Sequence, residues 1–192
     1  MTTLNWGIIG PGTIARAFAG GLAHSKTGQL VAIASRSPKP DLADKFPGAR
    51  VLKGYDALLA DKEVEAVYIA TPHPQHAEWA IKAAEAGKHV LVEKPLALSA
   101  FEIDAVFHAH KKAGTFAGEA YMYRLHPMIG RLIALIRDGA IGEVRMIQSS
   151  FGYQMGSIDP TLKHFRNDLA GGGILDVGGY PVSIARLIAG AV

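Results

Sequence analysis

The segment that most constrains the fold of this chain is a glycine-rich stretch close to the N-terminus. It reads Trp6-Gly-Ile-Ile-Gly10-Pro-Gly12-Thr-Ile-Ala15, a short apolar run that leads through closely spaced glycines into a stretch of helical composition. Glycines at this spacing permit a tight turn between a strand and a helix, and they let a pyrophosphate approach the backbone. Glycines alone often mark only a loop, but a strand before and a helix after favour a dinucleotide-binding turn. The residues expected at the nucleotide are Gly10, Gly12, Thr13 and Ile14.

The first 118 residues alternate short apolar runs with longer segments that are helical in pattern. Four runs have the composition of strands buried on both faces: residues 6–10, 30–34, 66–70 and 89–93. Helix-ending glycines stand at Gly87 and Gly114, and Ser99 with Glu102 forms a capping box. Such alternation builds right-handed βαβ units and a parallel sheet. We therefore predict an α/β fold in which residues 1–118 form a doubly wound parallel sheet of the Rossmann type.

Residues 119–192 are predicted to begin a second, α+β domain that serves the substrate. The pattern predicts a helix over Pro127 to Asp138, a strand over Arg145 to Tyr153 and a helix over Ile174 to Ala189. One strand and two helices can neither close a sheet nor cover one. We therefore expect this second domain to be truncated and the chain to be part of a longer protein.

Composition excludes several classes of function. The chain has no cysteine, so it has no disulfide, iron–sulfur ligand or thiol nucleophile. Its 20 basic and 17 acidic residues are spread along the sequence, which argues against a nucleic-acid-binding surface. We expect no secretory leader, because the first residues have no cationic segment, and no apolar stretch reaches without interruption the roughly 18 to 20 residues that cross a bilayer. We expect a cytoplasmic protein whose partner is a small molecule rather than a nucleic acid or a membrane.

Two pairs of histidines invite a metal interpretation. His73 and His76 lie close together, but no third and fourth ligands stand at a recognisable spacing, so we predict no metal site. His108 and His110 lie two apart on a later predicted helix, where we expect both to be exposed to solvent.

The end of the second predicted strand bears on the choice of cofactor. An NAD-specific domain usually places Asp or Glu there to bind the ribose 2′-hydroxyl, whereas this chain has Ser35, Arg36 and Ser37. Serine hydroxyls can donate hydrogen bonds, and the guanidinium fork of Arg36 suits a phosphate. We therefore expect NADP, with NAD as the alternative; the competing interpretation is a solvated arginine that follows a strand.

Four motifs in order along the chain resemble one family. They are Ala70-Thr-Pro-His-Pro-Gln-His76, Glu93-Lys94-Pro95, Glu119-Ala-Tyr-Met-Tyr-Arg-Leu-His-Pro127 and Gly171-Gly-Gly-Ile-Leu-Asp-Val-Gly-Gly-Tyr180. Together they resemble the glucose-fructose oxidoreductase, inositol dehydrogenase and MocA (Gfo/Idh/MocA) family. The version with Tyr180 is similar to dimeric dihydrodiol dehydrogenases and NADP-dependent aldose (xylose) 1-dehydrogenases. The resemblance implies a Rossmann domain plus an open-faced sheet through which a homo-oligomer, a dimer or tetramer, would assemble.

The resemblance also implies a catalytic set of Lys94, Asp176 and Tyr180. Free tyrosine and lysine both titrate near pH 10, but a neighbouring cation favours tyrosinate. Tyr180 would be the acid/base and Lys94 its electrostatic partner, with the Lys94–Pro95 bond cis. Asp176 lies four residues before Tyr180 and would share a helix face with it. The competing interpretations are a core aromatic for Tyr180, a helix cap for Asp176 and a surface lysine for Lys94.

Further site residues follow from the same resemblance. Contacts to the cofactor are implied for Ala70, Thr71, Pro72, His73, His76, Glu93 and Lys94. Arg124 and His126 would touch the substrate, although a structural role at a helix start is equally open for His126. The implied activity is hydride transfer between NADP and a hydroxyl carbon of a carbohydrate, a cyclic polyol or a dihydrodiol. The alternatives are a non-catalytic nucleotide-binding sensor or repressor, and a sugar-to-sugar oxidoreductase that retains its cofactor.

Overall fold

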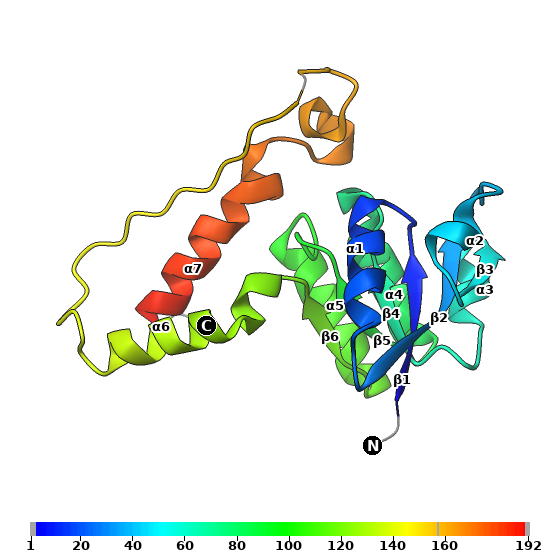
Figure 1. Ribbon diagram of the computed structural model, residues 1–192, viewed down its shortest axis with the longest axis horizontal. Helices are drawn as coiled ribbons and strands as arrows, with labels where there is room; N and C mark the ends of the chain where they lie inside the picture. Colours follow the sequence, from blue (N-terminus) through cyan, green and yellow to red (C-terminus); the bar gives the residue numbers. More distant parts are fainter. Residues whose placement is uncertain (1–2, 157, 191–192) are drawn as a thin grey trace. The chain divides into compact units, whose positions relative to one another are not determined.

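The computed structural model describes residues 3–156 and 158–190 of the chain (Figure 1). The chain forms two compact units, of which the first ends at Ala120 and the second begins at Tyr121. Among the described residues, no helix is both long enough and apolar enough to cross a membrane.

The first unit is built on a six-stranded sheet with the order β3-β2-β1-β4-β5-β6 and with every pair parallel. Its strands are β1 (Leu4–Ile9), β2 (Gly28–Ser35), β3 (Arg50–Lys53), β4 (Ala66–Ile69), β5 (His89–Val92) and β6 (Ala117–Glu119). The strand order reverses between β1 and β4, and in such sheets ligands bind where the carboxyl ends diverge at this point. The predicted α/β fold with a Rossmann-type parallel sheet is confirmed. The pattern misses the edge strands β3 and β6, because neither is a continuous apolar run: β3 begins with Arg50 and ends with Lys53, and β6 is Ala117-Gly-Glu119.

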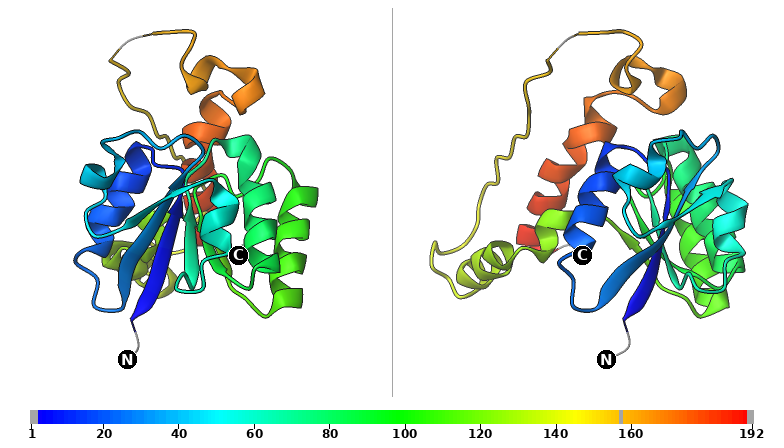
Figure 2. Two further views of the ribbon diagram at one scale, coloured as in Figure 1. Left: turned by 90° about the vertical axis from the view of Figure 1, so that its right-hand side faces the viewer. Right: turned by 45° about the vertical axis from the view of Figure 1, so that its right-hand side comes forward.

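Helices cover both faces of this sheet. They are α1 (Thr13–Leu22), α2 (Leu42–Lys45), α3 (Tyr55–Leu59), the 3₁₀ turn η1 (His73–Gln75), α4 (His76–Glu85) and α5 (Ala100–Ala113). Figure 2 shows α1 on one side of the sheet and α4 with α5 on the other. The predicted cap of α5 is confirmed: the Ser99 hydroxyl accepts from the Glu102 N–H at 3.2 Å, and Gly114 ends the helix at a φ of 69°. The Glu102 carboxylate accepts from the N–H of Leu98 rather than of Ser99.

Two apolar cores result, one on each face. Ile8 and Ile9 are neighbours in β1 and both fully buried, but they belong to different cores because successive strand residues point to opposite faces. Ile9 packs with Trp79 of α4 and Val106 of α5, and Ile8 packs with residues on the α1 side. The sheet is therefore buried on both faces, as the continuous apolar runs predict.

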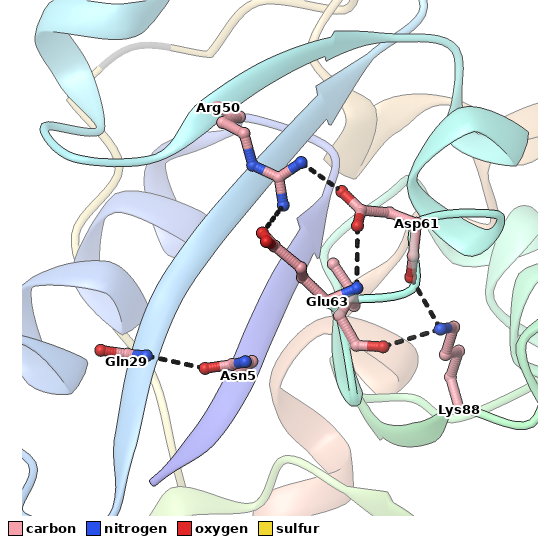
Figure 3. A network of polar contacts seen from close by, with 7 residues as sticks. Asn5, Gln29, Arg50, Asp61, Glu63 and Lys88 are labelled. Atoms are coloured by element: carbon pink, nitrogen blue, oxygen red, sulfur yellow. Dashed lines mark hydrogen bonds and ion pairs between the residues drawn. The ribbon is translucent and has the colours of Figure 1, made fainter.

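A polar network lies at the amino end of the sheet (Figure 3). Arg50 forms ion pairs with Asp61 at 2.9 Å and with Glu63 at 2.7 Å, and Lys88 donates to two carbonyl oxygens of the same loop. Burial raises the pKa of Asp61, but the Glu63 N–H and the Arg50 guanidinium outweigh this and hold that pKa below its ordinary value. Polar groups at this edge thus have partners within the chain, whereas some at the opposite edge do not.

The second unit is mainly helical. It contains η2 (Met122–Leu125), α6 (Pro127–Arg137), η3 (Lys163–Phe165), η4 (Asn167–Leu169), the π-helical turn η5 (Ile174–Gly178) and α7 (Gly179–Ala189). The helix that was expected from Pro127 is confirmed. The helix expected from Ile174 begins instead as the π turn and becomes a regular α-helix only at Gly179, since glycines interrupt its first turns.

The predicted strand over Arg145 to Tyr153 is wrong. These residues form no strand in the structure, although the chain there is extended. A strand needs a neighbour for its backbone hydrogen bonds, and no other described segment of the second unit is a strand that could pair with it.

Candidate functional site

The glycine turn lies at the carboxyl end of β1. Gly10 has a φ of 92°, and a Cβ atom built there would lie 2.7 Å from the carbonyl oxygen of Ala70, so only glycine fits. Gly12 is the N-cap residue of α1, and the space around it is open. No described side chain caps α1, so its first-turn N–H groups remain available to an anion. Thr13 and Ile14 are exposed at the same place.

The end of β2 presents a cation beside the neighbouring loop. Ser35 is buried, and its hydroxyl accepts from the Ser37 N–H at 3.3 Å. Arg36 and Ser37 are exposed, and the guanidinium carbon of Arg36 lies 6.0 Å from the ring centroid of the buried Tyr55. Such a contact can orient the guanidinium while leaving its N–H groups for a ligand.

The turn after β4 contains polar atoms without partners. Ala70 extends the strand by donating its N–H to the Ile9 carbonyl, Thr71 and His73 are buried, and Pro72 is exposed. The hydroxyl oxygen of Thr71 and the side-chain oxygen of Gln75 are buried, and neither has a hydrogen-bond partner among the described residues. Buried polar atoms in this state require an explanation, of which a bound ligand is one. Gln75 stands inside the quoted motif of residues 70–76, but the sequence analysis assigns it no role. The signal that could have found it is a polar side chain in the turn after a central strand.

The segment after β5 holds Lys94 between fixed neighbours. The Lys94–Pro95 bond is cis, as the resemblance implies. Before it, Glu93 accepts a hydrogen bond from the Tyr68 hydroxyl; after it, the Leu96 N–H donates to Glu119 at 2.8 Å. Lys94 itself is half-buried at the carboxyl edge of the sheet. The Gly10 turn and the buried, unpartnered oxygens of Thr71 and Gln75 lie at the same edge of the sheet. The residues present therefore fit a dinucleotide cofactor.

In the second unit, Asp176 is held by two side chains that the sequence analysis misses. Its carboxylate accepts from the Tyr153 hydroxyl at 3.0 Å, and the same oxygen lies 3.5 Å from His164 Nε2. The hydrogen bond to Asp176, together with burial and the carboxylate charge, raises the pKa of Tyr153. Tyr153 and His164 stand 23 and 12 residues before Asp176, too far for any helical or strand period to reveal the contact.

Tyr180 lies in a cluster of aromatic rings of the second unit. Its ring centroid is 5.1 Å from that of Tyr121, 5.1 Å from that of Phe151 and 5.9 Å from that of Tyr123. Gly179 is required beside it, because a Cβ atom there would collide with the Tyr121 hydroxyl. Tyr180 is half-buried rather than enclosed in a dry core.

The remaining predicted residues are placed as follows. Arg124 is exposed in η2, and His126 is exposed where its Nδ1 accepts from the Met128 N–H at 3.2 Å, which caps α6. The helix-start role of His126 is thus present in the structure.

Lys94 belongs to the first unit, whereas Asp176 and Tyr180 belong to the second, so their convergence on one site stays a prediction.

The expectation that both His108 and His110 are exposed is half wrong. His108 is exposed, but His110 is buried, with Nδ1 at 2.7 Å from the Thr115 hydroxyl and Nε2 at 3.1 Å from the Ala80 carbonyl oxygen. The reason is that α5 packs on α4 through this side chain. Burial lowers the pKa of His110.

Across the described chain, no three His, Asp or Glu side chains are grouped so that they could hold a metal ion.

Comparison with protein families accounts for both units. Residues 4–121 match the family model described as an oxidoreductase family with an NAD-binding Rossmann fold, and residues 129–192 match the GFO/IDH/MocA C-terminal domain. The chain belongs to the Gfo/Idh/MocA family. The resemblance drawn from the four motifs is therefore confirmed.

Relatives within the Gfo/Idh/MocA family include enzymes of the expected kinds. D-xylose 1-dehydrogenase (NADP(+)) 2 of Haloferax volcanii is 41% identical over 170 residues, 84% of this chain and 50% of that protein. Trans-1,2-dihydrobenzene-1,2-diol dehydrogenase of Mus musculus is 35% identical over 192 residues, 98% of this chain and 57% of that protein. The structure of KijD10, a 3-ketoreductase from Actinomadura kijaniata in complex with NADP and TDP-benzene, is similar with a TM-score of 0.83 at 31% identity, covering 98% of this chain and 58% of that one. The chain spans about half the length of the curated relatives it matches.

Proposed function

We propose that this Gfo/Idh/MocA protein is an oxidoreductase that transfers a hydride between NADP and the CH–OH carbon of a carbohydrate, a cyclic polyol or a dihydrodiol. The observation that carries the proposal is the carboxyl edge of the sheet. There the Gly10 turn has no room for a side chain, the start of α1 is uncapped, and the Thr71 oxygen is buried without a partner. Related dehydrogenases and reductases that act on sugars and dihydrodiols support the substrate class.

The residues of the first unit have distinct roles toward the cofactor in this proposal. The start of α1, with Gly10, Gly12, Thr13 and Ile14, would bind the pyrophosphate through N–H groups. Arg36 and Ser37 would bind the 2′-phosphate, because they are the exposed cation and hydroxyl at the end of β2. Ala70, Thr71, Pro72, His73 and Glu93 would border the nicotinamide side. When bound, the nicotinamide accepts or donates the hydride.

The remaining chemistry falls to side chains of this chain. Oxidation of an alcohol carbon requires a group that takes the hydroxyl proton, and we assign this role to the phenol of Tyr180. Lys94 would supply a positive charge that favours the ionised phenol and orients the substrate oxygen. Asp176, whose carboxylate is already oriented by Tyr153, would accept a hydrogen bond from a second substrate hydroxyl. Arg124 and His126 would border the substrate.

The proposal includes a cytoplasmic location and a homo-oligomeric state. The absence of cysteine agrees with a reducing compartment. NAD remains the alternative cofactor.

Nucleotide binding and turnover test the proposal separately. Calorimetric titration with NADP and NAD tests binding, and NADPH formation with D-xylose, D-glucose, myo-inositol and a trans-dihydrodiol tests turnover by the full-length protein. We expect NADP to bind and at least one substrate to be oxidised. Binding without turnover on any of them would favour the sensor or repressor, and a failure to bind either nucleotide would refute the proposal.

A further inference from the structure

His76 is the first residue of α4 and is fully buried, beside the carboxyl edge of the sheet. Its ring lies between two segments that border this edge. Nδ1 lies 2.7 Å from the carbonyl oxygen of Pro95, and Nε2 lies 2.8 Å from the carbonyl oxygen of Thr71. One side chain therefore connects the turn after β4 with the segment that carries Lys94.

Both partners are backbone carbonyl oxygens rather than flexible side chains. The ring is fully buried, so solvent does not compete for either contact. The distance between the Thr71 turn and the segment after β5 therefore depends on this side chain.

His110 offers an internal comparison because it is also a buried histidine with two polar contacts. Its partners are the Thr115 hydroxyl and the Ala80 carbonyl oxygen, and neither belongs to the Thr71 turn or to the segment that carries Lys94. The two residues therefore share burial but differ in the segments that they connect.

We propose that His76 is a positioning residue that holds the Lys94–Pro95 segment against the Thr71 turn. It does not touch the substrate; it acts through Lys94 and through the edge that receives the nucleotide. The link to nucleotide binding rests on the proposed function, whereas the connection between the segments does not.

Amide hydrogen exchange at Leu96 tests the positioning role. His76→Asn places an amide near the Nδ1 position and can keep the contact to Pro95, whereas His76→Gln places one near Nε2 and keeps the contact to Thr71. We expect Leu96 exchange to rise by about tenfold or more in the Gln variant and less in the Asn variant. His110→Gln is the matched control and should leave Leu96 exchange unchanged.

Affinity for NADP gives the final comparison. The His76→Gln variant should bind NADP about tenfold more weakly than wild type, with His110→Gln close to wild type at a similar loss of melting temperature. Equal effects of the two substitutions on Leu96 exchange and on affinity would overturn the positioning role. If wild type fails to bind NADP, the proposed function fails, and the exchange results still decide the role of His76.

Discussion

Arg36 is the exposed cation at the end of β2, at the position where an acidic residue would select NAD. Arg36→Ala should weaken NADP binding by about tenfold or more and leave NAD binding unchanged, because only NADP carries a 2′-phosphate. Calorimetric titration with both nucleotides measures this difference. Lys39→Ala, which removes another exposed charge of the same loop, is the control. An equal loss of affinity for both nucleotides would show that Arg36 does not recognise the 2′-phosphate.

Tyr180 is proposed as the group that takes the substrate proton. Tyr180→Phe removes only the phenolic oxygen and keeps the ring in its aromatic cluster, so kcat should fall by about 100-fold or more at nearly unchanged NADP affinity. Steady-state kinetics of the full-length enzyme tests this.

The matched control for Tyr180 is Tyr123→Phe. Tyr123 lies in the same cluster, and its hydroxyl is 2.6 Å from the Ser183 hydroxyl, so its loss should affect stability rather than rate. Similar kcat values for wild type and the Tyr180→Phe enzyme would rule out Tyr180 as the acid/base.

Among the elements, α4 and α5 pack together through His110, and this contact depends on pH. Burial lowers the pKa of His110 below its ordinary value of 6.5, so the folded protein keeps the ring neutral where the unfolded chain takes up a proton. The stability contributed by the neutral ring is therefore present above about pH 6.5 and is lost as pH falls toward the lower folded pKa.

Urea unfolding at about pH 7.5 and about pH 5.5 measures this loss. The wild-type protein should lose more stability between these values than His110→Gln, whose amide can still donate to the Ala80 carbonyl without titrating. His108→Gln, at an exposed position of the same helix, should behave like wild type. Parallel pH profiles for wild type and His110→Gln would contradict the prediction.

At the scale of the whole molecule, the two units differ in how much core they contain. Every buried apolar side chain in the described chain belongs to the first unit except Ile133. A protein that ends at Ala120 should therefore fold cooperatively and bind NADP, since it contains its own core and the glycine turn. Residues 121–192 alone should show no cooperative transition and should bind a hydrophobic dye, because Met128, Ile141 and Met146 are exposed.

Thermal unfolding and NADP titration of the two separate segments test this division. The 192-residue chain is the control and should show the unfolding transition of the first unit. A cooperative transition in residues 121–192 alone, or an unfolded first unit, would contradict it.

Sequence alone determined the features that depend on local backbone chemistry. The Gly10 turn, the Ser99 cap and the helix-ending Gly114 require particular residue types at particular dihedral angles, and a run buried on both faces is visible as a continuous apolar stretch. The Rossmann-type sheet, its central strands and the candidate residues at its carboxyl edge could therefore be predicted.

Only the tertiary structure decided which distant segments meet. The burial of His110 against Ala80, the two carbonyl partners of His76 and the contact of Asp176 with Tyr153 join residues whose spacing follows no helical or strand period. The same holds for the missing strand between positions 145 and 153, because a strand exists only where a second strand accepts its hydrogen bonds. Local propensity determines how a segment can fold, whereas pairing and burial depend on the rest of the molecule.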